Sequence, residues 1–188
     1  MTVRPIVITG DPVLHSPAKP VTEFDDSLRT LVADMFETMD LAPGVGLAGP
    51  QVGVPLRLFV FSYDHDPSGP KRGVAINPTL WITPPPVGEA EDGSDSEGCL
   101  SVPGERYPLL RSAKARLDAV DLDGTPFHLD ADGWFARILQ HEYDHLDGVL
   151  YVDRLEFLHQ RRARKQVVKN GWGKPGSSWL PGVDDLEA

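Results

Sequence analysis

The sequence predicts an α+β fold, in which small antiparallel β-sheets surround a buried central helix and two further helices lie near the N- and C-termini. Apolar side chains recur at three- and four-residue steps in residues 25–41 and 132–148, which is the spacing of one helix face. Apolar and polar residues alternate in residues 55–63 and 115–122, as they do in half-buried strands. A chain of 188 residues is most simply one domain, so we expect a single domain over residues 1–188.

The first predicted helix, residues 25–41, carries a stripe of leucine and methionine. Asp25 or Asp26 can cap its N-terminus, and Pro43-Gly44 ends it. An apolar stripe of this kind predicts packing in the core rather than a binding surface.

Strands are expected in two parts of the chain, residues 55–77 and residues 115–129. Residues 55–63 form the first, and residues 74–77 begin another. Residues 115–122 and 126–129 are expected to pair as a hairpin, because Asp123-Gly124 between them is typical of a tight turn.

Two segments lack the periodicity of helices and strands. Residues 84–96 are rich in proline, glycine, serine and acidic residues, so we expect an exposed, mobile loop. The C-terminal tail, residues 170–188, keeps Trp172 and Trp179, so part of it is expected to pack.

A final helix is expected over residues 152–169. Its apolar positions are Leu155, Leu158, Ala163 and Val167. It also carries a basic cluster in an otherwise acidic protein, made of Arg161, Arg162, Arg164 and Lys165. The cluster is either a solvated helix face or a binding surface.

Composition excludes several classes of protein. A formal net charge of -10 argues against a dedicated nucleic-acid binder, which needs concentrated positive charge. No apolar run approaches the roughly 18 residues of a membrane span, and the start lacks a secretory signal. A single cysteine, Cys99, forms no intrachain disulfide and suits a reducing compartment. We therefore expect a cytoplasmic protein without a membrane partner, and a monomer.

The most informative motif is H-E-x-x-H in the predicted central helix, which Asp132 can cap and Gly148 can end. His141 and His145 are four residues apart, so both imidazoles lie on one helix face and can reach a single ion. Glu142 lies roughly 60° around the helix from His145, close enough to contact a water on that ion. This layout is typical of metal-assisted hydrolysis, although short motifs also recur by chance.

A third ligand must come from elsewhere in the chain. In metzincin proteases the motif extends to a third histidine, but Tyr151 occupies that place here. Cys99 is a better candidate, because flanking glycines allow the backbone to approach an ion and a thiolate suits a soft or borderline metal. With no second cysteine, a fourth position stays open for water, as in catalytic sites. Four other histidines lack motif context: His15, His65, His128 and His159.

Three segments together resemble the signature motifs of the peptide deformylase family, in the family's order. They are Gly44–Gln51 (GVGLAGPQ), Glu97–Ser101 (EGCLS) and Gln140–Gly148 (QHEYDHLDG). The resemblance extends over most of the chain, from Gly10 to the final helix. One departure is Gly49, where the family commonly has alanine, and it removes only a methyl group.

The resemblance implies a cofactor and a substrate. Cys99, His141 and His145 are then the metal ligands, and the ion in the cell is Fe(II), with Zn, Ni or Co as substitutes; spacing alone suggests zinc. The implied substrates are formyl-methionyl nascent peptides, from which formate is released. In related bacterial deformylases the final helix docks on the ribosome, which is a possible partner for the basic cluster here.

The resemblance also implies catalytic roles for three residues. Glu142 takes a proton from water and returns it to the departing amine. The Gln51 side-chain amide and the Leu100 backbone N–H stabilise the negative charge that develops on the formyl oxygen.

The substrate also needs an apolar slot for methionine. Val45, Trp134 and Ile138 are candidates, because Trp134 and Ile138 share a helical stripe with the two histidines. Ordinary core packing explains these residues nearly as well. Gly46 and Gly98 are expected to offer backbone groups to the peptide.

Four charged residues are candidates for the surroundings of the site. Glu97 and Arg106 are expected to support the metal ligands or line the cleft, and a surface pair is an equal interpretation. Arg137 is expected to reach solvent or pair with an acid. Asp144 is expected to be a solvated helix residue.

Two alternatives to a deformylase stay open. The first is a metalloprotease or other amide hydrolase with the same H-E-x-x-H chemistry. The second is a non-catalytic homologue, although such a protein would not need Glu142 and Gln51.

Overall fold

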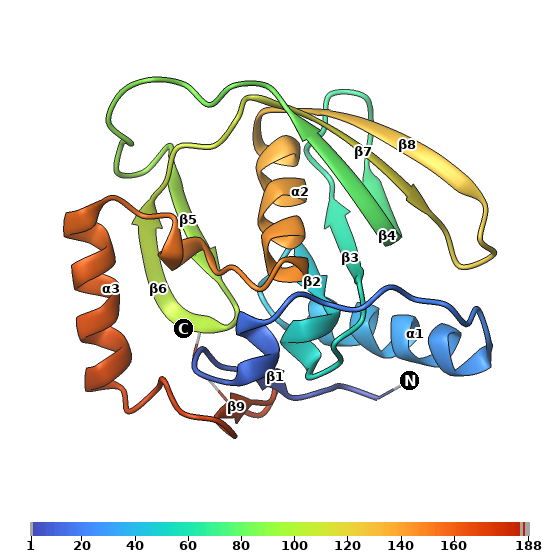
Figure 1. Ribbon diagram of the computed structural model, residues 1–188, viewed down its shortest axis with the longest axis horizontal. Coiled ribbons are helices and arrows are strands. Elements are labelled where there is room, and N and C mark those ends of the chain that lie inside the picture. The colour runs from blue at the N-terminus through green and yellow to red at the C-terminus, as the bar shows by residue number, and fades with distance from the viewer. Residues whose placement is uncertain (1, 185, 187–188) are drawn as a thin grey trace.

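The computed structural model describes residues 2–184 and 186, and within them the architecture is α+β (Figure 1). The helices are α1 (Asp26–Leu41), α2 (Gly133–Leu146) and α3 (Phe157–Lys169). The strands are β1 (Ile6–Val7), β2 (Gly46–Ala48), β3 (Leu58–Tyr63), β4 (Lys71–Ile82), β5 (Ser96–Cys99), β6 (Val102–Pro108), β7 (Lys114–Val120), β8 (Pro126–Asp132) and β9 (Ser178–Trp179). Antiparallel pairing gives one sheet in the order β2-β3-β4-β7-β8 and two small sheets, β5-β6 and β1-β9. The predicted fold class is confirmed.

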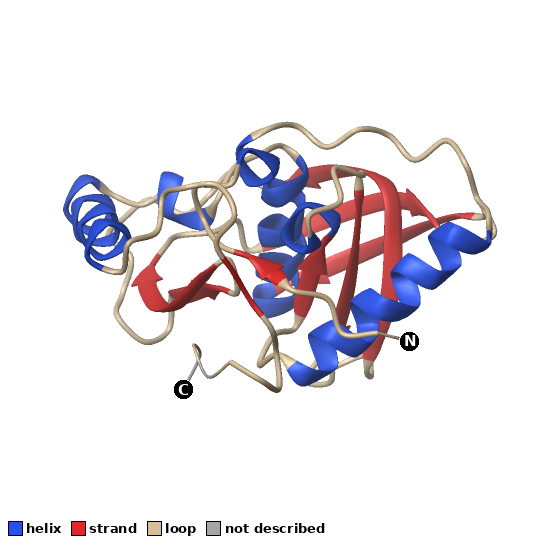
Figure 2. Ribbon diagram, turned by 90° about the horizontal axis from the view of Figure 1, so that it is seen from below, coloured by secondary structure: helices blue, strands red, loops and turns tan. Residues whose placement is uncertain are grey.

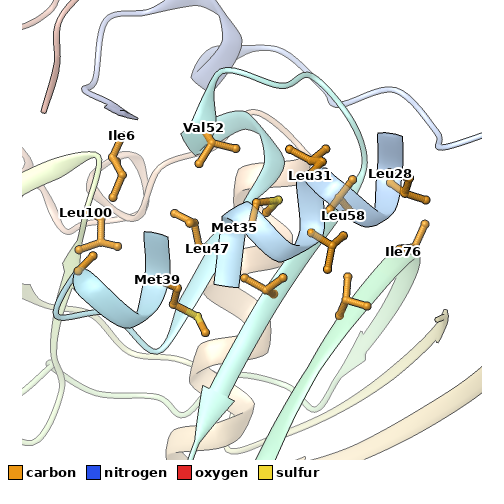
Figure 3. Close-up of a cluster of buried hydrophobic side chains, with 14 of the residues drawn as sticks. Ile6, Leu28, Leu31, Met35, Met39, Leu47, Val52, Leu58, Ile76 and Leu100 are labelled. Atoms are coloured by element: carbon orange, nitrogen blue, oxygen red, sulfur yellow. The ribbon is translucent and has the colours of Figure 1, made fainter. Parts of the chain in front are cut away.

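Strand β3 is buried on both faces because a helix covers each side of the sheet. Leu58 and Val60 share a core with the apolar stripe of α1, whereas Phe59 and Phe61 point the other way and pack with α2. Helix α1 runs across one face of the sheet (Figure 2). Figure 3 shows its core, where Met35 meets the sheet residues. The β3 strand is thus the rigid platform on which α2 is held.

Helix α2 lies between the five-stranded sheet and the β5-β6 hairpin (Figure 1). Its ends agree with the sequence prediction: Asp132 is the N-cap residue, and Gly148 follows the last turn with φ of 75°. A Cβ atom on Gly148 would lie 2.7 Å from the backbone of Ser16, so the close approach of these two segments requires glycine.

The final helix begins later than predicted, at Phe157 rather than at residue 152. Residues Tyr151–Asp153 form a 3-10 turn, and the Asp153 carboxylate accepts a hydrogen bond from the Leu150 N–H at 3.0 Å. Leu150 and Leu155 are buried, so the chain turns to place both in the core before α3 starts.

The remaining strand predictions hold in part. The hairpin of β7 and β8 is present, but β3 begins at Leu58 rather than at residue 55, and β4 begins at Lys71, before residue 74. Strands β1, β2, β5, β6 and β9 are not among the predicted elements. Residues 83–95 join β4 to β5 without helix or strand and are mostly exposed.

Residues 1, 185, 187 and 188 of the predicted domain and tail lie outside the described residues. A single domain over residues 1–188 therefore stays a prediction. In the part of the chain that the structure describes, no helix is both long enough and apolar enough to cross a membrane.

Candidate metal centre

Three side chains that can ligate a metal ion converge where β5 meets α2. Cys99 ends β5, and His141 and His145 lie one turn apart on α2. The Cys99 Sγ is 3.3 Å from the His145 Nε2, which is 3.2 Å from the His141 Nε2. Among the described residues, this is the one group of three or more histidine, cysteine or acidic side chains close enough to share an ion.

These separations fit a single tetrahedral ion. With metal–nitrogen bonds of about 2.0–2.1 Å and a metal–sulfur bond of about 2.3 Å, tetrahedral angles place neighbouring ligand atoms roughly 3.3–3.6 Å apart. The observed separations, 3.3 Å between sulfur and nitrogen and 3.2 Å between the two nitrogens, are each slightly shorter than in an ideal site. Three protein ligands leave one position for water or substrate, which is typical of catalytic rather than structural sites.

Glu97 orients His141 from the side away from the metal group. Its Oε1 is 2.7 Å from the His141 Nδ1, so a neutral ring carries its proton there and presents Nε2 to the ion. Arg111 donates to both oxygens of Glu97, at 2.7 and 3.1 Å, and Arg137 donates to Oε2 at 3.0 Å. Burial raises the pKa of Glu97, but its bonds to His141 and Arg111 lower that pKa more, so Glu97 is an ionised carboxylate.

The two histidines differ in how readily they become neutral ligands. Burial lowers the pKa of His145 well below its ordinary value, which favours the neutral imidazole. Burial also lowers the pKa of His141, but the negative charges of Cys99 and Glu97 raise it more, and the net shift is upward. An ion at His141 would require the neutral ring, so metal binding and protonation compete for this side chain.

Glu142 lies beside the metal group and is 4% exposed. Its Oε2 has no hydrogen-bond partner among the described residues, so this oxygen can accept a proton from water or substrate. Gly46 lies against it: a Cβ atom on Gly46 would be 2.3 Å from the Glu142 Oε1. Burial raises the pKa of Glu142 to about 7, so this carboxylate can take up and release a proton near neutral pH.

Gln51 is aimed at the metal group by the short 3-10 helix Gly49–Val52 that follows β2. The Gln51 Oε1 accepts a hydrogen bond from the Ala48 N–H at 2.9 Å, which turns the amide nitrogen Nε2 toward the Cys99 Sγ at 3.6 Å. Leu100 directly follows Cys99 and lines the same pocket. The amide of Gln51 and the residue Leu100 therefore border the space next to the ligands.

A pocket of about 110 Å³ opens onto the metal group. Ile138 is buried in its wall, whereas Val45 and Trp134, which are 42% and 40% exposed, form part of its rim. Arg106 also lines the pocket and lies against Gly98. The pocket is thus apolar at its wall and charged at its metal end.

The model of the polypeptide deformylase family matches residues 3–161. The chain belongs to the polypeptide deformylase family. Peptide deformylase 2 of Corynebacterium efficiens is 50% identical over 186 residues, which are 98% of this chain and 96% of that protein. The peptide deformylase of Mycolicibacterium smegmatis is 50% identical over 191 residues, which are 97% of this chain and 96% of that protein.

Solved structures agree with the sequence relatives. The crystal structure of a peptide deformylase from Legionella pneumophila superposes with a TM-score of 0.76 and 41% identity, and covers 90% of this chain and 95% of that chain. Deformylases are metal-dependent hydrolases that remove the formyl group from nascent polypeptides, and this chain is an enzyme of that family. The Cys-His-His group fits the single metal ion of such an enzyme.

The structure brings the predicted site residues together. Twelve of them line the one pocket: Val45, Gly46, Gln51, Glu97, Gly98, Cys99, Leu100, Arg106, Trp134, Ile138, His141 and Glu142. His145 completes the metal group beneath it. Between the two interpretations of Glu97, a surface pair with Arg106 is wrong, because Glu97 is buried and bonded to His141.

The sequence prediction was wrong about Asp144 and contained no role for Arg111. Asp144 is 5% exposed rather than solvated, since it accepts hydrogen bonds from Arg111 at 2.6 Å and from Arg154. Arg111 thereby joins Asp144 to Glu97. Arg137, for which two roles were open, pairs with an acid, Asp95, at 3.1 Å. The arginines and acids of this network are scattered over residues 95–154 without a fixed spacing, so no sequence motif reveals it.

Proposed function

We propose that Cys99, His141 and His145 hold one metal ion with which this deformylase hydrolyses the N-formyl amide of nascent polypeptides. The observation that carries the proposal is the convergence of three ligand atoms beside the buried, unpartnered oxygen of Glu142. An ion held there supplies Lewis acidity, which makes water acidic enough to ionise near neutral pH.

The protein's own residues divide the remaining work. Glu142 takes the proton from the attacking water and later gives it to the departing amine nitrogen, because the nitrogen would otherwise have to leave as an amide anion. The Gln51 amide and the Leu100 N–H donate to the formyl oxygen as it becomes negative. Each such donor is typically worth about 10²- to 10³-fold in rate.

The pocket supports recognition of a formyl-methionine end. Ile138, Val45 and Trp134 give an apolar slot for the methionine side chain, and Gly46 and Gly98 bring backbone groups close to a peptide. At the metal end of the same pocket we propose room for the formyl group and not for bulkier acyl groups.

The finer assignments follow from family membership and from the ligand set. We propose Fe(II) as the ion in the cell, with Zn, Ni or Co as substitutes, since a thiolate and two imidazoles suit this series. A buried, unpaired Cys99 and a nascent-chain substrate support a cytoplasmic location. We also propose that the enzyme acts as a monomer.

Formate release tests the function. The holoenzyme is incubated with formyl-Met-Ala-Ser and with the acetylated peptide, and formate and peptide fragments are measured. We expect formate from the formyl peptide, little acetate from the acetyl peptide and no internal cleavage. Cleavage at internal bonds would instead support the metalloprotease alternative, and binding without turnover would support a non-catalytic homologue.

Docking on the ribosome is a second proposal. The four side chains of the basic cluster on α3 are exposed: Arg161, Arg162, Arg164 and Lys165. Phe157 and Leu158 are also exposed, at 74% and 65%, although Leu158 was expected on the buried stripe. A cluster of positive charge on one helix of an acidic protein suits the phosphates of ribosomal RNA. Co-sedimentation with ribosomes at low salt should weaken when these four residues are neutralised, and unchanged binding would refute the proposal.

A further inference from the structure

The C-terminal tail contacts the residue that follows Cys99 through the side chain of Trp179. After α3 the chain returns to the N-terminal segment, where β9 pairs with β1 and Trp179 lies opposite Ile6 (Figure 1). The Trp179 side chain is 3% exposed, and its Nε1–H donates to the Leu100 carbonyl oxygen at 2.9 Å. The family model ends at residue 161, so this contact comes from outside the matched part of the chain.

The peptide unit that Trp179 holds also contacts a metal ligand. The Leu100 carbonyl and the Ser101 N–H belong to one planar unit, which rotates as a whole. At its other edge, the Ser101 N–H donates to the Cys99 Sγ at 3.4 Å. Rotation of this unit would therefore carry the Ser101 N–H away from the Cys99 sulfur.

The same tail supports Ser101 by a second route through the N-terminal segment. The Thr9 N–H donates to the Ser101 carbonyl oxygen at 2.8 Å, and the Thr9 carbonyl accepts from the Gly173 N–H at 3.0 Å. The backbones touch here, since a Cβ atom on Gly10 would lie 2.2 Å from Gly173. Residues 99–101 are thus held from behind by segments from both ends of the chain.

The indole N–H can be separated from the packing of the ring. Trp179 belongs to the same apolar core as Ile6 and Leu100, whose side chains lie near each other in Figure 3. A phenylalanine at this position keeps an aromatic ring in the core but removes the donor to the Leu100 oxygen. The donor's own effect is therefore open to measurement.

We propose that Trp179 is a positioning residue for deformylation. It fixes the Leu100–Ser101 peptide unit and, through the Ser101 N–H, holds the Cys99 sulfur in place at the metal centre. The inference rests on the proposed role of Cys99 as a metal ligand. Trp179 contacts no reacting atom, so its hydrogen bond acts on the rate through the geometry of Cys99.

The test compares Trp179→Phe with Trp172→Phe in Co(II)-loaded enzyme. Trp172 is a control for the loss of ring packing, because it lies in the same tail and packs both against the same core and against the cluster that contains Cys99. Among the hydrogen bonds of the described residues, the indole bond to Leu100 belongs to Trp179, and Trp172 has no counterpart to it. For Trp179→Phe we expect kcat to fall about 2- to 10-fold, the range for one lost neutral hydrogen bond, with KM nearly unchanged. We also expect the thiolate-to-Co(II) absorption band to shift. Trp172→Phe should keep the native kcat and the native band.

Equal kcat values and equal spectra for the two variants would overturn the inference. If Trp179→Phe does not fold, incorporation of benzothienylalanine at residue 179 gives the same comparison, because sulfur replaces the N–H while the fused rings stay. If the native enzyme releases formate and the two variants have the same kcat and the same spectrum, this inference is refuted and the proposed function stands. If the native holoenzyme releases no formate, the proposed function is refuted instead.

Discussion

Gly46 sets how closely strand β2 approaches Glu142, so Gly46→Ala perturbs that carboxylate without changing its chemistry. The added methyl group would lie 2.3 Å from the Glu142 Oε1 and 2.6 Å from its Cδ. Restoring an ordinary van der Waals contact moves the carboxylate by about 1 Å, and a misplacement of that size can cost about 10²-fold in rate. Glu142 is buried and on a packed helix, so the side chain rather than the helix is expected to move.

We therefore expect Gly46→Ala to lower kcat for a formyl-Met peptide about 100-fold, with the fold and the bound metal retained. Steady-state formate release gives kcat, and circular dichroism and elemental analysis check the fold and the metal. Gly73→Ala is a control in the same sheet, since the nearest neighbour of its methyl group would be the Phe61 ring, at 3.0 Å. It should stay within about threefold of the native kcat, because Gly73 lies outside the pocket.

A double-mutant cycle decides whether the effect passes through Glu142. In a Glu142→Ala background the methyl group of Gly46→Ala has room, so it should change the residual rate by less than about threefold. A 100-fold loss that persists in that background would refute the reasoning, because the methyl group would then act on the substrate. Native kcat in Gly46→Ala alone would refute it as well.

Three further predictions concern the surroundings of the site and the fold. Glu97→Gln weakens the bond that orients a metal ligand, so chelator competition should report about 10- to 100-fold lower metal affinity; unchanged affinity would contradict this. Arg137→Met removes the donors to Asp95, and hydrogen bonds to a charged group of this kind are worth about 1.5–3 kcal/mol. The rate of amide hydrogen exchange in residues 83–95 should therefore rise about tenfold or more. Native protection of these amides would contradict this prediction. Burial raises the pKa of Asp34, but a backbone N–H and an arginine that donate to it lower that pKa below its usual value. The contribution of ionised Asp34 to the free energy of unfolding is thus complete above about pH 4 and is lost as pH falls through the pKa of the folded state. Asp34→Asn should therefore flatten the acid side of the curve of stability against pH, measured by urea unfolding. An unchanged slope would exclude this role.

The features that the sequence predicts well are local. Helical geometry alone places His141 and His145 on one face, and the caps Asp132 and Gly148 follow from residue type. Cys99 lies more than 40 residues away, and only the combined motifs connect it with the histidines before the structure is known. The metal ligands can therefore be predicted from short motifs, although Cys99 and the two histidines are far apart in the chain.

The features that the sequence does not predict depend on contacts between distant segments. Asp144 has the polarity of a surface residue, and it is buried only because Arg111 and Arg154 fold over it from outside its helix. The pairing of β9 with β1 joins the two ends of the chain, and two-residue strands have no periodicity to reveal them. The contact of Trp179 with Leu100 depends on that pairing.

Glu142 is the residue on which the account depends most, so Glu142→Ala gives its most direct test. The native chain and the variant are purified anaerobically, the metal-to-protein ratio is determined, and formate release from a formyl-Met peptide is measured for both. The account predicts one bound ion in each protein and a rate lower by about 10²- to 10⁴-fold in the variant, the usual contribution of a general acid–base group. Native activity in Glu142→Ala with its ion in place would contradict it.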